Sequence, residues 1–256
     1  MSVDIEVDSG PVPQQYSAKP VISVITATYN GARHLPALIE SLQSQTDSDF
    51  EWVVADGCST DGSLALLAAI ENLNIKVSSQ PDFGIYDALN RALRLSSGEY
   101  YLVVGSDDQL SINAIADFKA AISASSADIV SADYEFCGAI RSVRSVGSVV
   151  GGLNAIVSQH SVASVYRCAL HDKFGFYSRK FPIAADFDFV LRAYKGGARI
   201  VHVPFVAGNF GSGGVSSVDV AGSLCEAFRV QIAAGESKIF QVGLLILRLL
   251  RHFSRL

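Results

Sequence analysis

Asp107 and Asp108 are the two residues of this sequence best suited to bind a cation. They follow residues 100–104, a continuous apolar run of strand length with a glycine close to each end. Ligands bind at the carboxyl ends of strands in open α/β sheets, and a carboxylate pair there suits a hard divalent cation that carries a phosphorylated substrate. The alternative is that either acid only caps a helix expected at 112–123. Because Ser111 is already a good N-cap for that helix, we favour metal or substrate binding.

Polar side chains also follow the other strands predicted in the first half of the chain. A β-branched strand runs from Val21 into a polar turn, and apolar runs at 51–56 and 75–79 indicate two more strands. Amphipathic helices are expected at 33–44, 63–71 and 84–95. This alternation implies βαβ units and a mostly parallel sheet with right-handed crossovers. One cleft at the strand ends could then collect Asn30, Asp56, Asp82, Asp107 and Asp108.

The second half of the chain predicts mixed strand pairing. The roughly alternating residues 139–150 are typical of a half-exposed strand or a hairpin, and further strands are expected at 128–134, 159–166 and 198–205. Apolar spacing predicts a helix at 182–194, with Asp186 in its first turn. A helix N-terminus favours an ionised carboxylate, so we expect Asp186 to be charged near neutral pH. Residues 208–216 are rich in glycine and predict a loop that can move.

Composition limits the classes of partner. The chain has 256 residues, enough for one large domain with a tail. Its net charge of -5 and sequence pI near 5.5 provide no basic field to attract nucleic acid. The four cysteines lie far apart without a Cys-x-x-Cys pair, which favours a reducing cytosol over a zinc site or a disulfide framework. Residues 1–20 begin with acidic and polar residues, so we expect a flexible leader rather than a signal peptide.

The C-terminal stretch, residues 237–256, predicts a basic amphipathic helix. Its apolar run at 242–247 is too short to span a bilayer. Such a helix suits an anionic membrane surface or a partner subunit, as in a homo-oligomer. The alternative is a tail helix that packs on its own domain. We therefore expect a cytoplasmic protein that binds peripherally at the inner face of the cell membrane if the helix contacts lipid.

Together these segments resemble the family 2 glycosyltransferases of the GT-A fold, which transfer a sugar from a nucleotide-diphospho-sugar. The resemblance covers about residues 20–216 and rests on an ordered set of segments: 24–30 (VITATYN), 56–62 (DGCSTDG), 81–90 (PDFGIYDALN), 106–108 (SDD) and 185–188 (ADFD). It implies an α/β, Rossmann-like fold with a mostly parallel or mixed central sheet flanked by helices and followed by the C-terminal amphipathic helix. The implied division is a leader at 1–20, a GT-A domain at 21–217 and a helical segment at 218–256.

The resemblance also assigns the donor site. Asp56 would accept the imide N–H of a pyrimidine base, since a carboxylate is a good acceptor for that group. Asp108 would contact Mg²⁺ or Mn²⁺ bridging the diphosphate, with Asp107 toward the ribose or a metal-bound water. The remaining donor residues are Thr28, Tyr29, Asn30, Asp82, Tyr86 and Asn90. For the last three, a role as caps or core residues is the alternative.

On the acceptor side, the resemblance makes Asp186 the base that deprotonates the acceptor hydroxyl, in a single displacement that inverts the anomeric centre. The acceptor would be a saccharide or a lipid-linked saccharide in polysaccharide or glycolipid assembly. The family often has Glu-Asp where this chain has Ala185-Asp186, and Asp188 is a possible substitute. His160 and His202 are secondary candidates, because a lone histidine is more often structural.

Two other functions compete with this interpretation. A non-catalytic sugar-nucleotide-binding or scaffold subunit would not need the acids at positions 108 and 186, which are present. A nucleotidyltransferase would need a glycine-rich basic loop after the first strand. The turn at 28–33 has one glycine and one arginine, so this second alternative is less favoured. A dinucleotide-binding fold lacks its Gly-x-Gly-x-x-Gly fingerprint in the first half of the chain.

Overall fold

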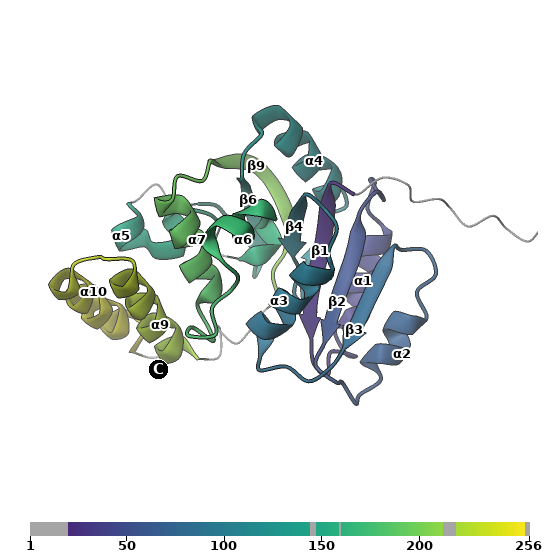
Figure 1. The fold of residues 1–256 in the computed structure, drawn as a ribbon, viewed down its shortest axis with the longest axis horizontal. Helices are drawn as coiled ribbons and strands as arrows, with labels where there is room; N and C mark the ends of the chain where they lie inside the picture. Colours follow the sequence, from purple (N-terminus) through teal and green to yellow (C-terminus); the bar gives the residue numbers. More distant parts are fainter. Residues whose placement is uncertain (1–19, 144–146, 159, 212–218, 254–256) are drawn as a thin grey trace, which may run out of the picture.

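A single mixed β-sheet runs through the protein (Figure 1). The computed structural model describes residues 20–143, 147–158, 160–211 and 219–253. In that part of the chain the sheet has the strand order β3-β2-β1-β4-β8-β6-β9-β5, with β7 paired to β6. In chain order the strands are β1 (Ile22–Thr28), β2 (Glu51–Asp56), β3 (Ile75–Ser79), β4 (Tyr100–Val103), β5 (Gln109–Leu110), β6 (Ile129–Phe136), β7 (Ala139–Arg141), β8 (Ser164–Arg167) and β9 (Ile200–Asn209).

The first four long strands are parallel, as predicted. Their register aligns Thr28 with Asp56 and Asp56 with Ser79, so the polar residues at the strand ends lie side by side. Beyond β4 the pairing becomes mixed, because β8 runs antiparallel to both β4 and β6 while β9 runs parallel to β6. The α/β class and the change from parallel to mixed pairing are therefore confirmed.

Helices cover both faces of the sheet. Alternate strand residues face opposite sides, so Trp52 and Val54 join one hydrophobic core while Val53 and Ala55 join the other. The first core is completed by α1 (Leu35–Gln43), α2 (Ser63–Ala68) and α4 (Ala114–Ser125). The second is completed by α3 (Ile85–Leu95), α6 (Ala169–Phe174) and α7 (Ala185–Lys195). These two apolar layers hold the carboxyl ends of β1, β2 and β4 at one edge.

The helix after Asp108 does not begin where the sequence predicted. It starts at Ala114, Asn113 occupies its N-cap position, and Ser111 does not cap it. The reason is β5, which pairs with β9 directly after Asp108 and delays the helix. Neither Asp107 nor Asp108 caps α4, so that alternative explanation of the two acids is wrong.

Residues 139–150 form less strand than predicted. Among the described residues of this stretch only Ala139–Arg141 are strand, as β7, which forms a hairpin with β6. Beyond residues 144–146, which lie outside the described part, the chain continues as α5 (Ser148–Gly151) and a 3-10 helix at Gly152–Ala155. Gly152 has φ of 62°, a left-handed conformation that interrupts the helical turns. The strand expected at 159–166 begins only at Ser164, after a 3-10 turn at Ser161–Ala163; residue 159 lies outside the described residues.

Two helices, α9 (Val220–Ala233) and α10 (Lys238–Arg251), end the described chain. They lie at the left of Figure 1, where α9 packs against α7 and α10 packs against α9. None of the described helices combines the length and the apolar character needed to cross a bilayer. The predicted leader, except residue 20, and most of the predicted glycine-rich loop, residues 212–216, lie outside the described residues. The division into three segments stays a prediction.

Candidate active site

Asp56 ends β2 as a fully buried carboxylate with one unused oxygen. Its Oδ2 accepts hydrogen bonds from the Ser59 N–H at 3.0 Å and from the Ser79 hydroxyl at 2.6 Å. Its Oδ1 is buried and has no hydrogen-bond partner among the described residues. Burial opposes ionisation, but the bonds from Ser59 and Ser79 outweigh it and lower the pKa of Asp56 below its ordinary value. The result is an ionised acceptor with a vacant oxygen.

The loops after β1 and β2 are bonded to each other. Asn30 has a left-handed φ of 50°; its N–H donates to the Ser59 hydroxyl at 2.8 Å, and its Oδ1 accepts the Thr60 N–H at 2.9 Å. Ala32 N–H donates to Asp61 Oδ2 at 2.8 Å. Asn30 therefore fixes the position of the loop that follows Asp56.

Tyr29 and Asp82 both lie close to Gly57 in this loop. A Cβ at Gly57 would lie 3.0 Å from Asp82 Oδ2 and 3.4 Å from the Tyr29 ring, so glycine permits the close approach. The hydroxyl of Thr28 is buried, and no residue in the described part of the chain forms a hydrogen bond with it. Four predicted donor residues, Thr28, Tyr29, Asn30 and Asp82, thus lie around the end of β2 with Asp56.

Asn90 does not join this group. It is buried in α3; its Nδ2 donates to the Tyr177 carbonyl at 2.9 Å and its Oδ1 accepts the Tyr177 N–H at 3.0 Å. Its amide is used to hold the chain that leads toward α7, which matches the alternative structural role.

Asp107 and Asp108 lie beyond β4 on the wall of a cavity of about 780 Å³. Asp108 is 2% exposed, and its two oxygens accept the N–H groups of Gly105 and Gly211, each at 2.9 Å. Burial, with a contribution from the charge of Asp107, raises the pKa of Asp108 to about 6. Asp107 is only half-buried. An acid that is costly to ionise beside a second acid fits a site for a divalent cation.

The protein alone does not complete a cation site within the described residues. No group of three or more His, Cys, Asp or Glu side chains is placed there to hold a metal ion. Each oxygen of Asp108 keeps acceptor capacity beyond its one backbone bond. A cation at Asp107 and Asp108 would take its other ligands from a bound diphosphate and water, as Mg²⁺ commonly does.

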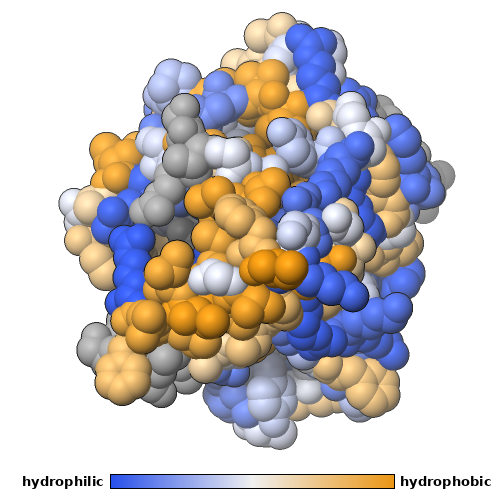
Figure 2. Space-filling model, turned by 90° about the vertical axis from the view of Figure 1, so that its left-hand side faces the viewer, coloured by the Kyte–Doolittle hydropathy of each residue, from blue (hydrophilic) through white to orange (hydrophobic). Residues whose placement is uncertain are grey.

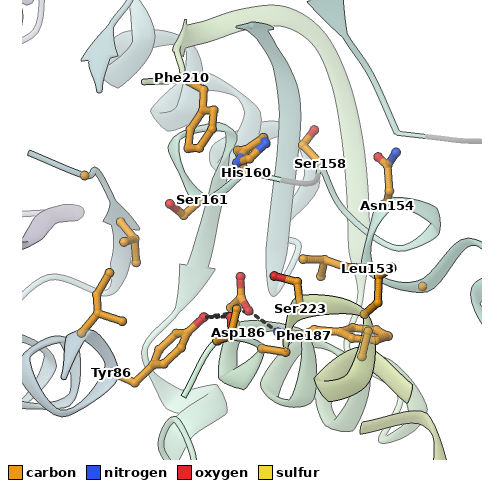
Figure 3. A pocket seen from close by; sticks show the side chains of 18 of the residues that line it. Tyr86, Leu153, Asn154, Ser158, His160, Ser161, Asp186, Phe187, Phe210 and Ser223 are labelled. Atoms are coloured by element: carbon orange, nitrogen blue, oxygen red, sulfur yellow. Dashed lines mark hydrogen bonds between the residues drawn. The ribbon is translucent and has the colours of Figure 1, made fainter. Parts of the chain in front are cut away.

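Asp186 points from the first turn of α7 into the same cavity, across from Ser161, His160 and Phe210 (Figure 3). Its Oδ1 accepts the Tyr86 hydroxyl at 2.9 Å and the Phe187 N–H at 2.7 Å. Burial raises the pKa of Asp186, with a smaller contribution from the charge of Glu226, and exceeds the lowering effect of its two hydrogen bonds. Loss of water around the carboxyl thus outweighs the groups that favour its ionised form, and the expectation that Asp186 is charged near neutral pH stays a prediction. A raised pKa still suits a general base.

Tyr86 can bond Asp186 in both protonation states. Its hydroxyl also lies 2.9 Å from the Ile183 carbonyl, but its single hydrogen can serve only one acceptor at a time. Burial and the neighbouring Asp186 raise the pKa of Tyr86 well above its ordinary value, so the hydroxyl keeps its hydrogen. An ionised Asp186 accepts that hydrogen. A protonated Asp186 can donate to the Tyr86 oxygen while Tyr86 donates to Ile183.

Glu226 of α9 is a buried acid that the sequence did not single out. Its Oε2 accepts the N–H groups of Ile183 at 2.8 Å and Ala184 at 2.9 Å, directly before α7. It thereby fixes the chain that delivers Asp186. Its only local signal is that it is the single acid of a 14-residue helix. Asp188, the possible substitute base, instead forms an ion pair with Arg192 at 2.9 Å on its own helix.

Comparison with known proteins identifies the family. The model of glycosyl transferase family 2 matches residues 23–157, more than half of the chain. This chain belongs to that family. A PGL/p-HBAD biosynthesis glycosyltransferase of Mycobacterium tuberculosis is 33% identical over 215 residues, which span 79% of this glycosyltransferase and 82% of the relative.

A second relative has solved structures. The poly(ribitol-phosphate) β-N-acetylglucosaminyltransferase TarS of Staphylococcus aureus is 32% identical over 189 residues, which are 70% of this glycosyltransferase and 33% of TarS. The crystal structure of TarS residues 1–349 matches with a TM-score of 0.66 and 27% identity, over 91% of this chain and 72% of that one. The same TarS fragment is known in complex with UDP and with UDP-GlcNAc.

The two candidate histidines of this glycosyltransferase, His160 and His202, differ in position. His160 lines the cavity and stacks on Phe210 with 3.4 Å between ring centroids; burial lowers its pKa to about 4, so it is neutral at neutral pH. His202 lies 3.1 Å from Asp133 and does not line the cavity. His160 can therefore contribute an aromatic surface and a neutral hydrogen-bonding group to the site.

Proposed function

We propose that this glycosyltransferase transfers a sugar from a UDP-sugar to an acceptor hydroxyl, with inversion at the anomeric carbon. The donor nucleotide is supported by Asp56, whose vacant, buried oxygen suits the imide N–H of uracil. It is also supported by TarS, which has been solved with UDP and UDP-GlcNAc. The diphosphate would extend from Asp56 toward Asp107 and Asp108.

The two adjacent acids would hold Mg²⁺ or Mn²⁺. A cation held there would supply positive charge against the negative charge of the departing nucleoside diphosphate, an effect worth several kcal/mol. The protein contributes the position of the acids, because Gly105 and Gly211 fix both oxygens of Asp108. A positive charge at this position would also lower the pKa of Asp108, which burial raises.

Asp186 would take the proton of the acceptor hydroxyl. The observation that carries the proposal is its geometry: a carboxyl with a raised pKa, held on one oxygen by Tyr86 and Phe187, on the wall of the cavity that Asp107 and Asp108 also line. The deprotonated acceptor oxygen attacks the anomeric carbon as the bond to the diphosphate breaks. One displacement from the opposite face gives inversion.

For the acceptor we propose a saccharide or a lipid-linked saccharide, in polysaccharide or glycolipid assembly. One relative is named for PGL/p-HBAD biosynthesis, and TarS is named for poly(ribitol-phosphate). The cavity has room for such an acceptor, since it extends from Asp107 past Asp186 to α10.

The decisive variant is Asp186→Asn, tested after a screen of UDP-sugars for thermal stabilisation identifies a donor. Asn keeps the shape and one acceptor oxygen but cannot take a proton. We expect turnover to fall by about 10²- to 10⁴-fold with unchanged UDP affinity. Asp188→Asn on the same helix is the control and should retain most of the activity. Normal transfer by Asp186→Asn, with loss in Asp188→Asn, would move the base to Asp188.

The cation is tested in the same assay. EDTA should weaken UDP-sugar binding and stop transfer, and Mn²⁺ or Mg²⁺ should restore both. Asp108→Asn should lose this response to the cation while still unfolding cooperatively. If EDTA changed neither UDP-sugar binding nor turnover, the proposed cation would be ruled out, but the proposed donor and base would not be affected.

A further inference from the structure

Helix α10 packs on the protein with its polar side. Gln241 is 1% exposed and donates to the Val149 carbonyl at 3.2 Å, and Arg248 donates to the Val150 carbonyl at 2.6 Å. These contacts bind α10 to α5. A helix that only completed its own domain would place its apolar side there. The alternative that α10 is a tail helix packing on its own domain therefore explains these contacts, but it does not explain why apolar residues of α10 are exposed.

Most of the large apolar residues of α10 are exposed instead. At 100° per residue, one stripe of α10 contains Ile239, Val242, Ile246 and Leu250, which are 45–87% exposed. Phe253, just beyond the end of the helix, is 77% exposed. Figure 2 shows the face of the molecule toward which α9 and α10 lie, with hydrophobic residues gathered over its middle. Large exposed apolar areas of this kind mark interaction surfaces.

Cations flank the stripe. Lys238 and Arg251 are exposed and fall on its two sides, about 100° and 120° from Ile239 by helical geometry. The segment 238–253 contains no Asp or Glu, although the whole chain carries a net charge of -5. Positive charge is thus concentrated beside the exposed apolar stripe.

We propose that α10 docks this protein on an anionic lipid bilayer, with the stripe in the interface and Lys238 and Arg251 at the level of the lipid head groups. Apolar area and attraction to anionic lipid both contribute to such binding. A second copy of the chain fits less well. Two α10 helices joined through their stripes would bring Lys238 and Arg251 of both copies together, with no acid on either helix to pair with them.

The docking would place the site at the membrane. The cavity that contains Asp186 is also lined by Leu247 and Arg251 of α10, so its far end lies beside the proposed lipid-facing surface. An acceptor with an apolar anchor could then enter the cavity while its anchor stays in the bilayer. The docking itself needs neither donor nor turnover, so it can be tested separately from the proposed reaction.

The test is sedimentation of the full chain with vesicles. We expect binding to vesicles that contain phosphatidylglycerol, weaker binding to phosphatidylcholine alone, and loss of binding at high salt. The double variant Ile239→Ser with Leu250→Ser should bind at least about tenfold less, because two large apolar side chains are removed. Lys238→Gln should weaken binding to anionic vesicles severalfold and leave binding to phosphatidylcholine vesicles unchanged. None of these three residues lines the cavity.

The matched control is Ile112→Ser with Ile140→Ser, which removes two isoleucines that are 57% and 64% exposed on other elements. It should bind vesicles as the wild type does. Thermal unfolding and UDP binding show whether each variant is folded. Equal vesicle binding by both double variants would overturn the proposal. The proposal would also be overturned if the wild type did not bind vesicles and formed a dimer in sedimentation velocity while the α10 double variant was monomeric.

Discussion

Asp56 and Asp186 are carboxylates whose surroundings shift their pKa values in opposite directions. Serine and backbone hydrogen bonds lower the pKa of Asp56 despite burial, whereas burial raises the pKa of Asp186 despite its two hydrogen bonds. A group that accepts a hydrogen bond from the donor base should stay ionised. A group that receives a proton during the reaction benefits from a pKa closer to neutral. The two shifts therefore suit the two proposed roles.

Removing the Asp56 carboxylate should weaken nucleotide binding. A hydrogen bond to a charged group contributes about 1.5–3 kcal/mol, so Asp56→Ala should reduce UDP affinity by roughly ten- to a hundredfold. Isothermal calorimetry measures the affinity, and thermal unfolding checks the fold. Asp117→Ala, in the first turn of α4, is the control. Unchanged affinity in Asp56→Ala would remove Asp56 from the donor site.

Tyr86→Phe should shift the pH dependence of turnover. The Tyr86 hydroxyl stabilises the ionised form of Asp186, so its loss should raise the pKa of Asp186 further. The base works only when ionised, hence the acid limb of the kcat profile should move to higher pH with unchanged UDP affinity. Tyr194→Phe, at an exposed position of α7, is the control. A lower melting temperature with an unmoved pH profile would give Tyr86 a structural role only.

At the level of elements, the carboxylate of α9 holds the start of α7. Glu226 accepts two backbone N–H groups before Asp186, and its charge contributes to the raised pKa of Asp186. The C-terminal helices therefore support the site as well as extending the molecule. No pattern within either helix could have revealed this contact, because the partners are 42 and 43 residues apart.

Glu226→Gln should shift the pH dependence of turnover in the opposite direction to Tyr86→Phe. Loss of the negative charge should lower the pKa of Asp186, so the acid limb of the kcat profile should move to lower pH. The neutral amide should also bind the two N–H groups less well, at a cost of about 1–2 kcal/mol in the free energy of unfolding. Urea denaturation and the pH profile measure the two effects. Glu236→Gln, which loses only an ion pair with Lys195, is the control and should leave the profile in place.

Across the whole molecule, sequence reasoning succeeded where local pattern and topology agree. The bounds predicted for β2 and β3 match the structure because β-branched and apolar runs there end at polar turns. The crossover rule then brought Asp56, Asp82 and their neighbours to one edge of the sheet. Sequence reasoning predicted too much strand at 139–150 and 159–166. The described residues there form strand only as β7, in a hairpin with β6, and as β8, while glycines 147, 151 and 152 accompany short helical turns.

The acceptor half of the site was harder to predict. Its wall combines Tyr86, Asp186, His160 and residues of α10, which come together only through packing between distant segments. The direction of the pKa shift of Asp186 also depends on this packing. A helix N-terminus is visible in the sequence, but the loss of water around the carboxyl is not.

The bonds between the loops after β1 and β2 have a kinetic consequence. Asn30 bonds to Ser59 and Thr60, and Ala32 bonds to Asp61, through groups of this chain alone. Because these bonds need no group of the donor, folding itself can fix the loops, and binding would then order little further chain there. We expect UDP to associate in one step, at a rate that rises linearly with its concentration and reaches no plateau from loop rearrangement.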